Sequence, residues 1–184
     1  MANRSCLLAA VFAACAVPAS ASVFVVGSSD ARLCYQAADS PLNPTVRDVR
    51  RCDDALLREN LSQYEIVATH VNRGILRLRR GLVEAAITDF DEAIRLDPEQ
   101  AEAYLNKGTA LLRRDNPTEA LQLYTVALER DTSRPAIAHY GRAIANEQLG
   151  NVRQAYADYQ LASQLAPEWN DPRVELQRFR VVPH

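Results

Sequence analysis

The sequence predicts an all-α protein in which helical hairpins stack one after another. One pattern of residues occurs three times, over residues 70–98, 104–132 and 139–167. Corresponding positions such as Gly74, Gly108 and Ala143 lie 34 and 35 residues apart, and a period of this length is typical of stacked helical repeats. The 184 residues, 48% of them hydrophobic, include few glycines and no long low-complexity run, which favours a well-buried helical domain.

Each copy of the pattern reads as two helices joined by a turn. Small and apolar residues recur at three- and four-residue steps, as at Ala86, Phe90 and Ala93, and this spacing is that of a buried helix face. Turn-forming residues divide the copies at Gly81, at 115–117 and at 150–151. We therefore expect three helical hairpins.

Two of these turns carry helix start signals. Asn116 predicts an N-cap, with Pro117 at the first helical position and Glu119 closing a capping box. Asn151 and Gln154 predict the same arrangement in the third copy. The second helix of each of these copies should begin directly after the turn.

The three copies resemble the tetratricopeptide repeat (TPR) family over residues 67–169. The resemblance rests on matched alanines and aromatic residues: Ala86, Ala120 and Ala155, then Phe90, Tyr124 and Tyr159, then Ala93, Ala127 and Ala162. It implies a right-handed superhelical stack over residues 64–167. The three repeats would cover about 67–100, 101–134 and 136–169. Thr132 stands where the family has a closing proline, which is a mild departure.

Residues 1–21 read as a secretory signal peptide. Arg4 supplies the basic start, residues 7–17 form a short apolar run, and residues 19–21 form a small-x-small cleavage site. Cys15 follows a lipoprotein-like box that matches less well than this site. We expect a periplasmic or secreted protein, because no other apolar run reaches the roughly 20 residues of a membrane span.

Residues 22–63 are expected to form an N-terminal arm and a degenerate helical hairpin. Residues 22–29 are apolar and then flexible, and they fit either a strand-like arm or a disordered lead-in. A short helix is predicted over residues 31–38, and a second helix, capped by Thr45, runs to about residue 59. A terminal hairpin is expected to be atypical because one of its faces meets water.

Cleavage after Ala21 would leave two cysteines, Cys34 and Cys52. Two cysteines in an exported chain usually pair. A metal site or a redox site of the CxxC type is less favoured, because neither cysteine has a second one beside it. We predict a disulfide across the front hairpin.

Residues 168–184 predict a capping helix and a tail. Trp169 is expected to cover the last hairpin, and Asp171 to N-cap the helix. Three apolar side chains are expected to lie on the stack: Val174, Leu176 and Phe179. The complete layout resembles small exported TPR proteins of alphaproteobacteria.

The charge pattern and the motifs point away from nucleic acid, metal ions and catalysis. A net charge of −2 provides no field that would attract nucleic acid. His70 and His139 hold matched positions but lie two repeats apart, too far to share a metal ion, and read as core histidines. Asp89 and Asp91 read as part of a solvated face. No phosphate-binding loop, nucleophile elbow or zincin motif occurs, so we expect no cofactor, no metal and no enzyme activity.

The family resemblance implies a concave groove lined by the first helix of each repeat. Its predicted residues are Val71, Asn72, Ile75, Arg79, Leu105, Asn106, Thr109, Arg113, Tyr140, Ile144 and Gln148. A subclass of the family that binds chaperone termini has cations in such a groove, whereas this chain has Val71, Ile137 and Gly141 in those places. We therefore expect a protein or peptide partner that is recognised without a cationic clamp.

Asn72 and Asn106 hold matched places, each after a large apolar residue and before a basic residue and a glycine. An amide offers both donors and an acceptor, so we predict that the two asparagines hold the backbone of a short apolar peptide on an exposed apolar stripe. The alternative is that they bond within the stack.

The predicted function is a non-catalytic protein–protein interaction module or scaffold of the bacterial envelope. One rival is a structural subunit of an envelope complex, held by its convex face or its ends. The other is an enzyme with a site between the front hairpin and the first repeat.

Overall fold

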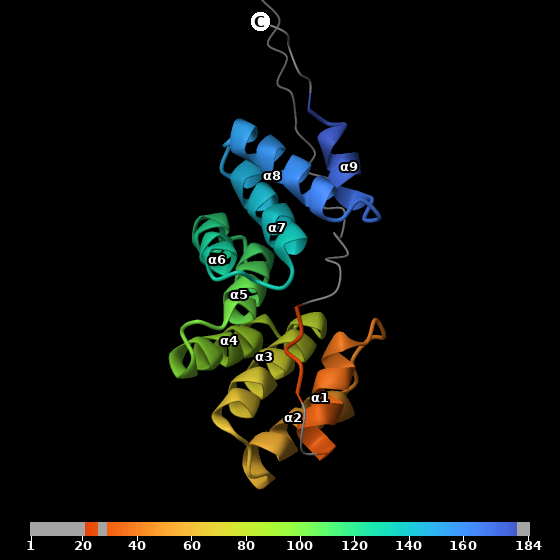
Figure 1. Cartoon of the computed structure of the whole chain (residues 1–184), viewed down its shortest axis with the longest axis vertical. Coiled ribbons are helices and arrows are strands. Elements are labelled where there is room, and N and C mark those ends of the chain that lie inside the picture. Colours follow the sequence, from red (N-terminus) through yellow and green to blue (C-terminus); the bar gives the residue numbers. More distant parts are fainter. Residues whose placement is uncertain (1–20, 26–28, 180–184) are drawn as a thin grey trace, which may run out of the picture.

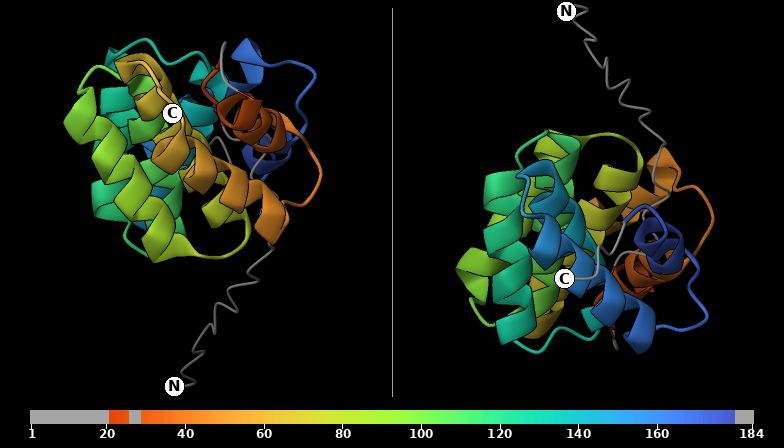
Figure 2. Two further views of the ribbon diagram at one scale, coloured as in Figure 1. Left: turned by 90° about the horizontal axis from the view of Figure 1, so that it is seen from below. Right: turned by 90° about the horizontal axis from the view of Figure 1, so that it is seen from above.

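The computed structural model describes residues 21–25 and 29–179. Secondary structure within these residues is helical. The helices are α1 (Ser29–Asp39), α2 (Val46–Arg58), α3 (Gln63–Arg79), α4 (Val83–Leu96), α5 (Ala101–Arg113), α6 (Pro117–Glu129), α7 (Pro135–Gln148), α8 (Val152–Leu165) and α9 (Asp171–Leu176). Figure 1 shows them rising in chain order along the long axis, and Figure 2 shows them turning about it. The predicted all-α stack of hairpins is confirmed.

Consecutive helices pair as antiparallel hairpins: α3 with α4, α5 with α6, and α7 with α8. Helices α1 and α2 form another hairpin at the front, packed against α3. The first helices α1, α3, α5 and α7 also touch in succession and line one face of the stack. This face is where the sequence predicts the groove.

Side-chain caps fix the starts of α2, α3 and α6. Thr45 forms a capping box with Asp48 at the start of α2, as its position predicts. The Asn116 side chain accepts a hydrogen bond from the Glu119 backbone N–H at 3.4 Å. The Glu119 carboxylate accepts from the Asn116 side-chain amide, whereas a complete capping box would have it accept from the Asn116 backbone N–H. The cap predicted at Asn151 is wrong, because its amide donates to the Asn146 side chain at 3.2 Å.

A large ring in the second helix of a hairpin packs on a glycine that has no side chain in its way. Phe90 lies against Gly74 within one hairpin. The Tyr124 ring lies between Gly108 of its own hairpin and Gly141 of the next. A Cβ atom added at Gly141 would stand 2.3 Å from the Tyr124 ring, whereas one at Gly108 would stand 3.2 Å from it.

We expect Gly141→Ala to lower the free energy of unfolding by about 1–3 kcal/mol, the usual cost of overpacking a core. The buried Tyr124 ring is only 1% exposed and cannot turn away. Gly108→Ala is the matched control, because the same ring is farther away and alanine gains about 1 kcal/mol of helix propensity. Urea unfolding of both variants measures the difference, and equal effects would show that the close approach is unimportant.

A disulfide and two hydrogen bonds hold the two helices of the front hairpin together. The Cys34 and Cys52 sulfurs are bonded in the structure, with Cα atoms 5.1 Å apart, inside the usual range of roughly 4.4–6.8 Å. The Glu59 carboxylate accepts hydrogen bonds from the first backbone N–H groups of α1, at Asp30 (3.0 Å) and Ala31 (3.3 Å). The geometry therefore fits the predicted disulfide, whose formation in the exported protein stays a prediction.

The last hairpin is covered by the segment that follows it. The ring centroids of Trp169 and Tyr140 lie 4.6 Å apart. Leu176 and Phe179 pack on the apolar cluster that contains Tyr140. Val174, however, is 46% exposed, so its predicted place on the stack is wrong. Asp171 is already the first residue of α9, and Asn170 holds the cap position without a side-chain bond.

Candidate peptide-binding groove

The chain's own N-terminal residues lie on the face lined by the first helices. Residues 21–25, which we call the arm, run between α1 and α3 and are drawn in red in Figure 1. The sequence left this stretch open as a strand-like arm or a disordered lead-in. The structure shows an extended segment bound at the predicted groove.

Asn72 holds one residue of the arm at two points. Its Oδ1 accepts a hydrogen bond from the Val23 backbone N–H at 2.9 Å, and its Nδ2 donates to the Val23 carbonyl at 2.8 Å. The side-chain amide thus pairs with the arm as a neighbouring β-strand would. Asn72 is fully buried, so these bonds satisfy polar groups that water cannot reach.

Three further bonds fix the rest of the arm. Asn106 Nδ2 donates to the Ala21 carbonyl at 3.1 Å, and the Tyr64 hydroxyl donates to the Phe24 carbonyl at 2.8 Å. The Ser22 hydroxyl donates to the Asp39 carboxylate at 2.8 Å. Burial raises the pKa of Tyr64, whose hydroxyl is protonated and can donate at neutral pH even at its ordinary pKa.

The arm alternates between buried and outward side chains, as an extended strand does. Ala21, Val23 and Val25 are 1%, 7% and 1% exposed. Phe24, by contrast, is 57% exposed. Its ring packs edge-to-face with that of Tyr35 in α1, with the ring centroids 5.2 Å apart. Backbone bonds and alternate apolar side chains together hold the arm.

The predicted groove residues divide into three groups. Val71, Asn72, Ile75, Leu105 and Asn106 are buried, and the apolar three share one cluster with Val23 and Val25. The polar ends of the others bond inside the stack: Arg79 to the Ala38, Ser40 and Leu42 carbonyls, Arg113 to the Leu78 carbonyl, and Thr109 to Tyr124. Tyr140 and Ile144 pack in a second cluster with Trp169, and Gln148 is exposed.

The expectation of an exposed apolar stripe is therefore wrong. The arm covers the groove over the first two repeats, and Trp169 covers Tyr140 in the third. The matched place of Asn72 and Asn106 in the third repeat is Gly141, which offers no amide. The backbone-holding part of the groove thus belongs to α3 and α5.

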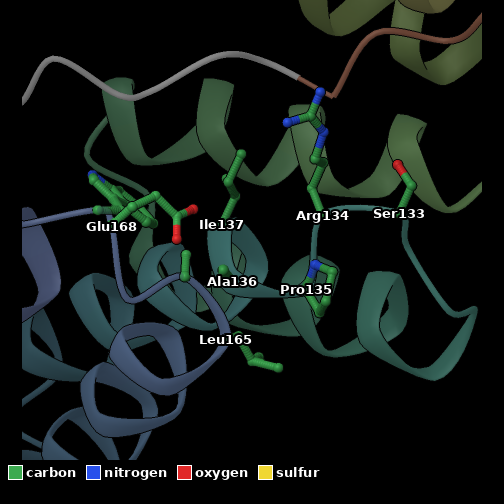
Figure 3. Close-up of a pocket in the computed structure, with 9 residues that line it drawn as sticks. Ser133, Arg134, Pro135, Ala136, Ile137, Leu165 and Glu168 are labelled. Carbon is green, nitrogen blue, oxygen red and sulfur yellow. The ribbon is translucent and has the colours of Figure 1, made fainter.

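A pocket of about 310 Å³ lies at the start of α7. The Glu102 carboxylate, one helical turn before Asn106, accepts a hydrogen bond from the Ser133 N–H at the pocket rim (2.9 Å). In Figure 3 Ile137 and Glu168 stand beside each other in this pocket, and Arg134 points away from Leu165.

Two buried ionic clusters, which the sequence reading missed, hold the hairpins together. Asp89, whose side chain is 2% exposed, accepts hydrogen bonds from Arg73 (2.6 Å) and Arg77 (2.8 Å). Arg73 also pairs with Asp53 of α2 at 2.8 Å, which ties the front hairpin to the first repeat. The interpretation of Asp89 as part of a solvated face is wrong, whereas its neighbour Asp91 is 53% exposed.

The third repeat carries the same arrangement. The Asp158 carboxylate accepts from Arg142 at 2.7 Å and lies 2.9 Å from Nδ1 of His139. Burial alone would raise the pKa of Asp158, but the hydrogen bonds from His139 and Arg142 outweigh burial and leave that pKa below its ordinary value. His70 lies 3.4 Å from Asp89 in the same way. His70 and His139 thus each face an aspartate of their own hairpin.

The helical spacing of these aspartates in the sequence indicates that they lie on the buried face of their helices. Asp89 follows Ala86 by three residues and precedes Ala93 by four, so it shares their buried face. Asp158 stands in the same relation to Ala155 and Ala162. The matched position in the second repeat is Leu123, which explains why that repeat lacks the cluster.

A protein-family model described as "Tetratricopeptide repeat" matches residues 71–135, which span the first two hairpins. Among solved structures, the first TPR of Spaghetti (RPAP3) bound to the HSP90 peptide SRMEEVD superposes with a TM-score of 0.59 at 19% identity. The match covers 62% of this chain and 90% of that one. Residues 71–135 thus match the tetratricopeptide repeat family, and the chain has the fold of that family.

A second TPR-like neighbour, the MamA RS-1 ArsTM double mutant, has a TM-score of 0.60 at 22% identity and covers 71% of this chain and 70% of that one. Identities this low describe a shared fold. The likeness to small exported TPR proteins of alphaproteobacteria stays a prediction.

Sequence relatives share the repeats within much longer proteins. The DnaJ homolog subfamily C member 7 homolog of Schizosaccharomyces pombe is 33% identical over 114 residues, which are 60% of this chain and 24% of that protein. Serine/threonine-protein phosphatase 5 of Homo sapiens is 34% identical over 99 residues, 54% of this chain and 20% of that protein. The TPR chain thus spans a quarter or less of these relatives.

TPR folds are typically interaction modules, and one neighbour is seen with a peptide. Within residues 21–25 and 29–179, no helix has both the length and the apolar character that crossing a bilayer requires.

Proposed function

We propose that this TPR protein is a non-catalytic protein–protein interaction module of the bacterial envelope, which binds an extended partner segment in the groove of α3 and α5. The two-point hold of Asn72 on the Val23 backbone carries the proposal. A side-chain amide that pairs with a backbone N–H and carbonyl can pair with any extended chain, whatever its side chains.

The groove differs in chemistry from what an acidic peptide needs. The groups that hold the arm backbone are two neutral amides and a hydroxyl. Arg79 and Arg113, the cations predicted in the groove, already donate to backbone carbonyls of α1, its following loop and α3. The peptide in the Spaghetti (RPAP3) neighbour contains three acidic residues. An apolar, extended partner suits this groove better.

The export prediction supplies the location in this proposal. The signal peptide and its cleavage fall on residues 1–20, which lie outside the described part of the chain, and on the bond after Ala21. A periplasmic or secreted partner follows from export.

We expect the double variant Asn72→Ala/Asn106→Ala to lose partner capture. A photo-crosslinking residue is placed at Gln148, the exposed residue of the predicted groove, and adducts are compared in native envelope fractions. The matched control is Gln122→Ala/Gln160→Ala. It removes two exposed amides from α6 and α8, which are second helices of their hairpins and lie away from the groove-lining first helices. Undiminished adducts in the asparagine variant, with circular dichroism showing it folded, would contradict the proposal.

A further inference from the structure

The arm occupies the place that the proposed function assigns to the partner, and it uses the same two asparagines. We propose that the arm is a stand-in for the partner. The groove selects extended segments with small or β-branched apolar side chains at every second position, and such a segment binds only when residues 22–25, the part of the arm that follows the predicted cleavage site, leave. This inference rests on the proposed function and adds the partner's chemistry and its competitor.

The register of the arm defines the inward positions. Ala21 meets Asn106 of the second repeat and Val23 meets Asn72 of the first, so one repeat corresponds to two residues of extended chain. Two strand residues span about 6.6–6.8 Å. Side chains between these positions point away from the groove.

The size of the inward side chains follows from their burial. Ala21, Val23 and Val25 are nearly inaccessible and lie in a continuous apolar cluster with Val71, Ile75 and Leu105. A closely packed cluster does not admit larger groups without strain. A charge at an inward position would be buried in this apolar cluster, and the groove cations Arg79 and Arg113 already donate to backbone carbonyls.

The outward positions are permissive. Phe24 is 57% exposed and touches Tyr35 through its ring edge, so an aromatic residue there gains a contact while a polar one loses little else. The partner class is therefore an uncharged strand with the pattern small–any–valine-like–any–valine-like.

Competition gives the test. The probe is the acetylated and amidated peptide ASVFV, which copies residues 21–25. The protein variant is Val23→Asp/Val25→Asp, which places charges at two inward positions of the arm and leaves every groove residue unchanged. Titrations are followed by the side-chain amide NMR signals of Asn72 and Asn106. If the arm fills the groove in ten of eleven molecules, opening it raises the apparent peptide affinity about tenfold.

Matched peptides and variants keep the result decisive. Peptide ASDFV, charged at an inward position, should not bind the opened protein, whereas ASVDV, charged at the outward position, should bind nearly as well as ASVFV. Phe24→Ser in the protein should leave the affinity close to that of the wild type. Val23→Pro removes the N–H that donates to Asn72, together with the buried valine side chain, without adding a charge, and it serves if the double variant is unfolded.

Three outcomes would overturn the inference. The first is that the opened protein binds ASVFV no more tightly than the wild type does. The second is that it binds ASDFV as tightly as it binds ASVFV. The third is a wild-type dimer that dissociates in Val23→Asp/Val25→Asp, because the arm would then serve a second copy of the chain. Each of these leaves the proposed function standing, since that depends on the loss of partner adducts in Asn72→Ala/Asn106→Ala.

Discussion

Asp89→Ala is expected to lower the free energy of unfolding by about 3–5 kcal/mol, the usual cost of removing one partner from a buried ion pair. The carboxylate accepts hydrogen bonds from Arg73 at 2.6 Å and 3.0 Å and from Arg77 at 2.8 Å. Without it, two guanidinium groups that are 14% and 21% exposed share only Asp53. Urea unfolding followed by circular dichroism measures the loss.

Asp91→Ala is the matched control, two residues along the same helix. Asp91 is 53% exposed and pairs with Lys107 at the surface, so its loss should cost no more than about 1 kcal/mol. Equal stabilities of the two variants would mean that the buried cluster contributes no more than a surface pair. Because Asp53 shares Arg73, the Asp89 variant should also loosen the contact between the front hairpin and the first repeat.

Removing the disulfide through Cys34→Ala/Cys52→Ala is expected to destabilise the protein by about 3 kcal/mol in the chain-entropy model. The two cysteines are 18 residues apart in sequence and both are fully buried. The bond restricts the unfolded chain, and the front hairpin has few large side chains with which to replace it. Thermal unfolding of the oxidised protein and of the variant gives the difference.

The same protein unfolded with a reductant present provides the control. Reduction should lower the stability of the wild type and leave that of the variant unchanged. Alkylation in denaturant without reductant, followed by intact-mass measurement, tests the bond itself. Two alkylated cysteines at these positions would refute the predicted disulfide.

The repeat period was sufficient to predict the fold because it records packing that recurs along the chain. Phe90 and Tyr124 pack on glycines at matched places, so the sequence pattern and the hairpin geometry express the same constraint. Caps were less predictable. Asn116 caps its helix, whereas Asn151 makes no cap bond and its amide donates to the Asn146 side chain.

The candidate site shows where single-sequence reasoning ended. Matched asparagines in the middle of helices predicted a role in holding backbone, and in the structure they hold the backbone of the arm. Residues 22–25 are too few to show a period, so nothing in the sequence placed them against α3. Whether a partner binds there stays a prediction.

The buried aspartates were missed for a different reason. Charge suggested solvent, while the three- and four-residue spacing of Asp89 with Ala86 and Ala93 indicated the core. The spacing was the better guide, because three side chains on α3 supply the partners that a buried carboxylate requires: His70, Arg73 and Arg77.

The covalent link between the arm and α1 sets a threshold for any competitor. Only residues 26–28 separate the two in sequence, and a peptide tied so closely to its site acts at an effective concentration in the millimolar range. A free partner at about micromolar concentration must therefore bind about a thousandfold more tightly than the arm's own contacts do. Short apolar strands exposed by unfolded proteins fall below this threshold. The tether thus insulates the groove from such strands and admits segments that gain additional contacts, for example in the pocket beside Trp169.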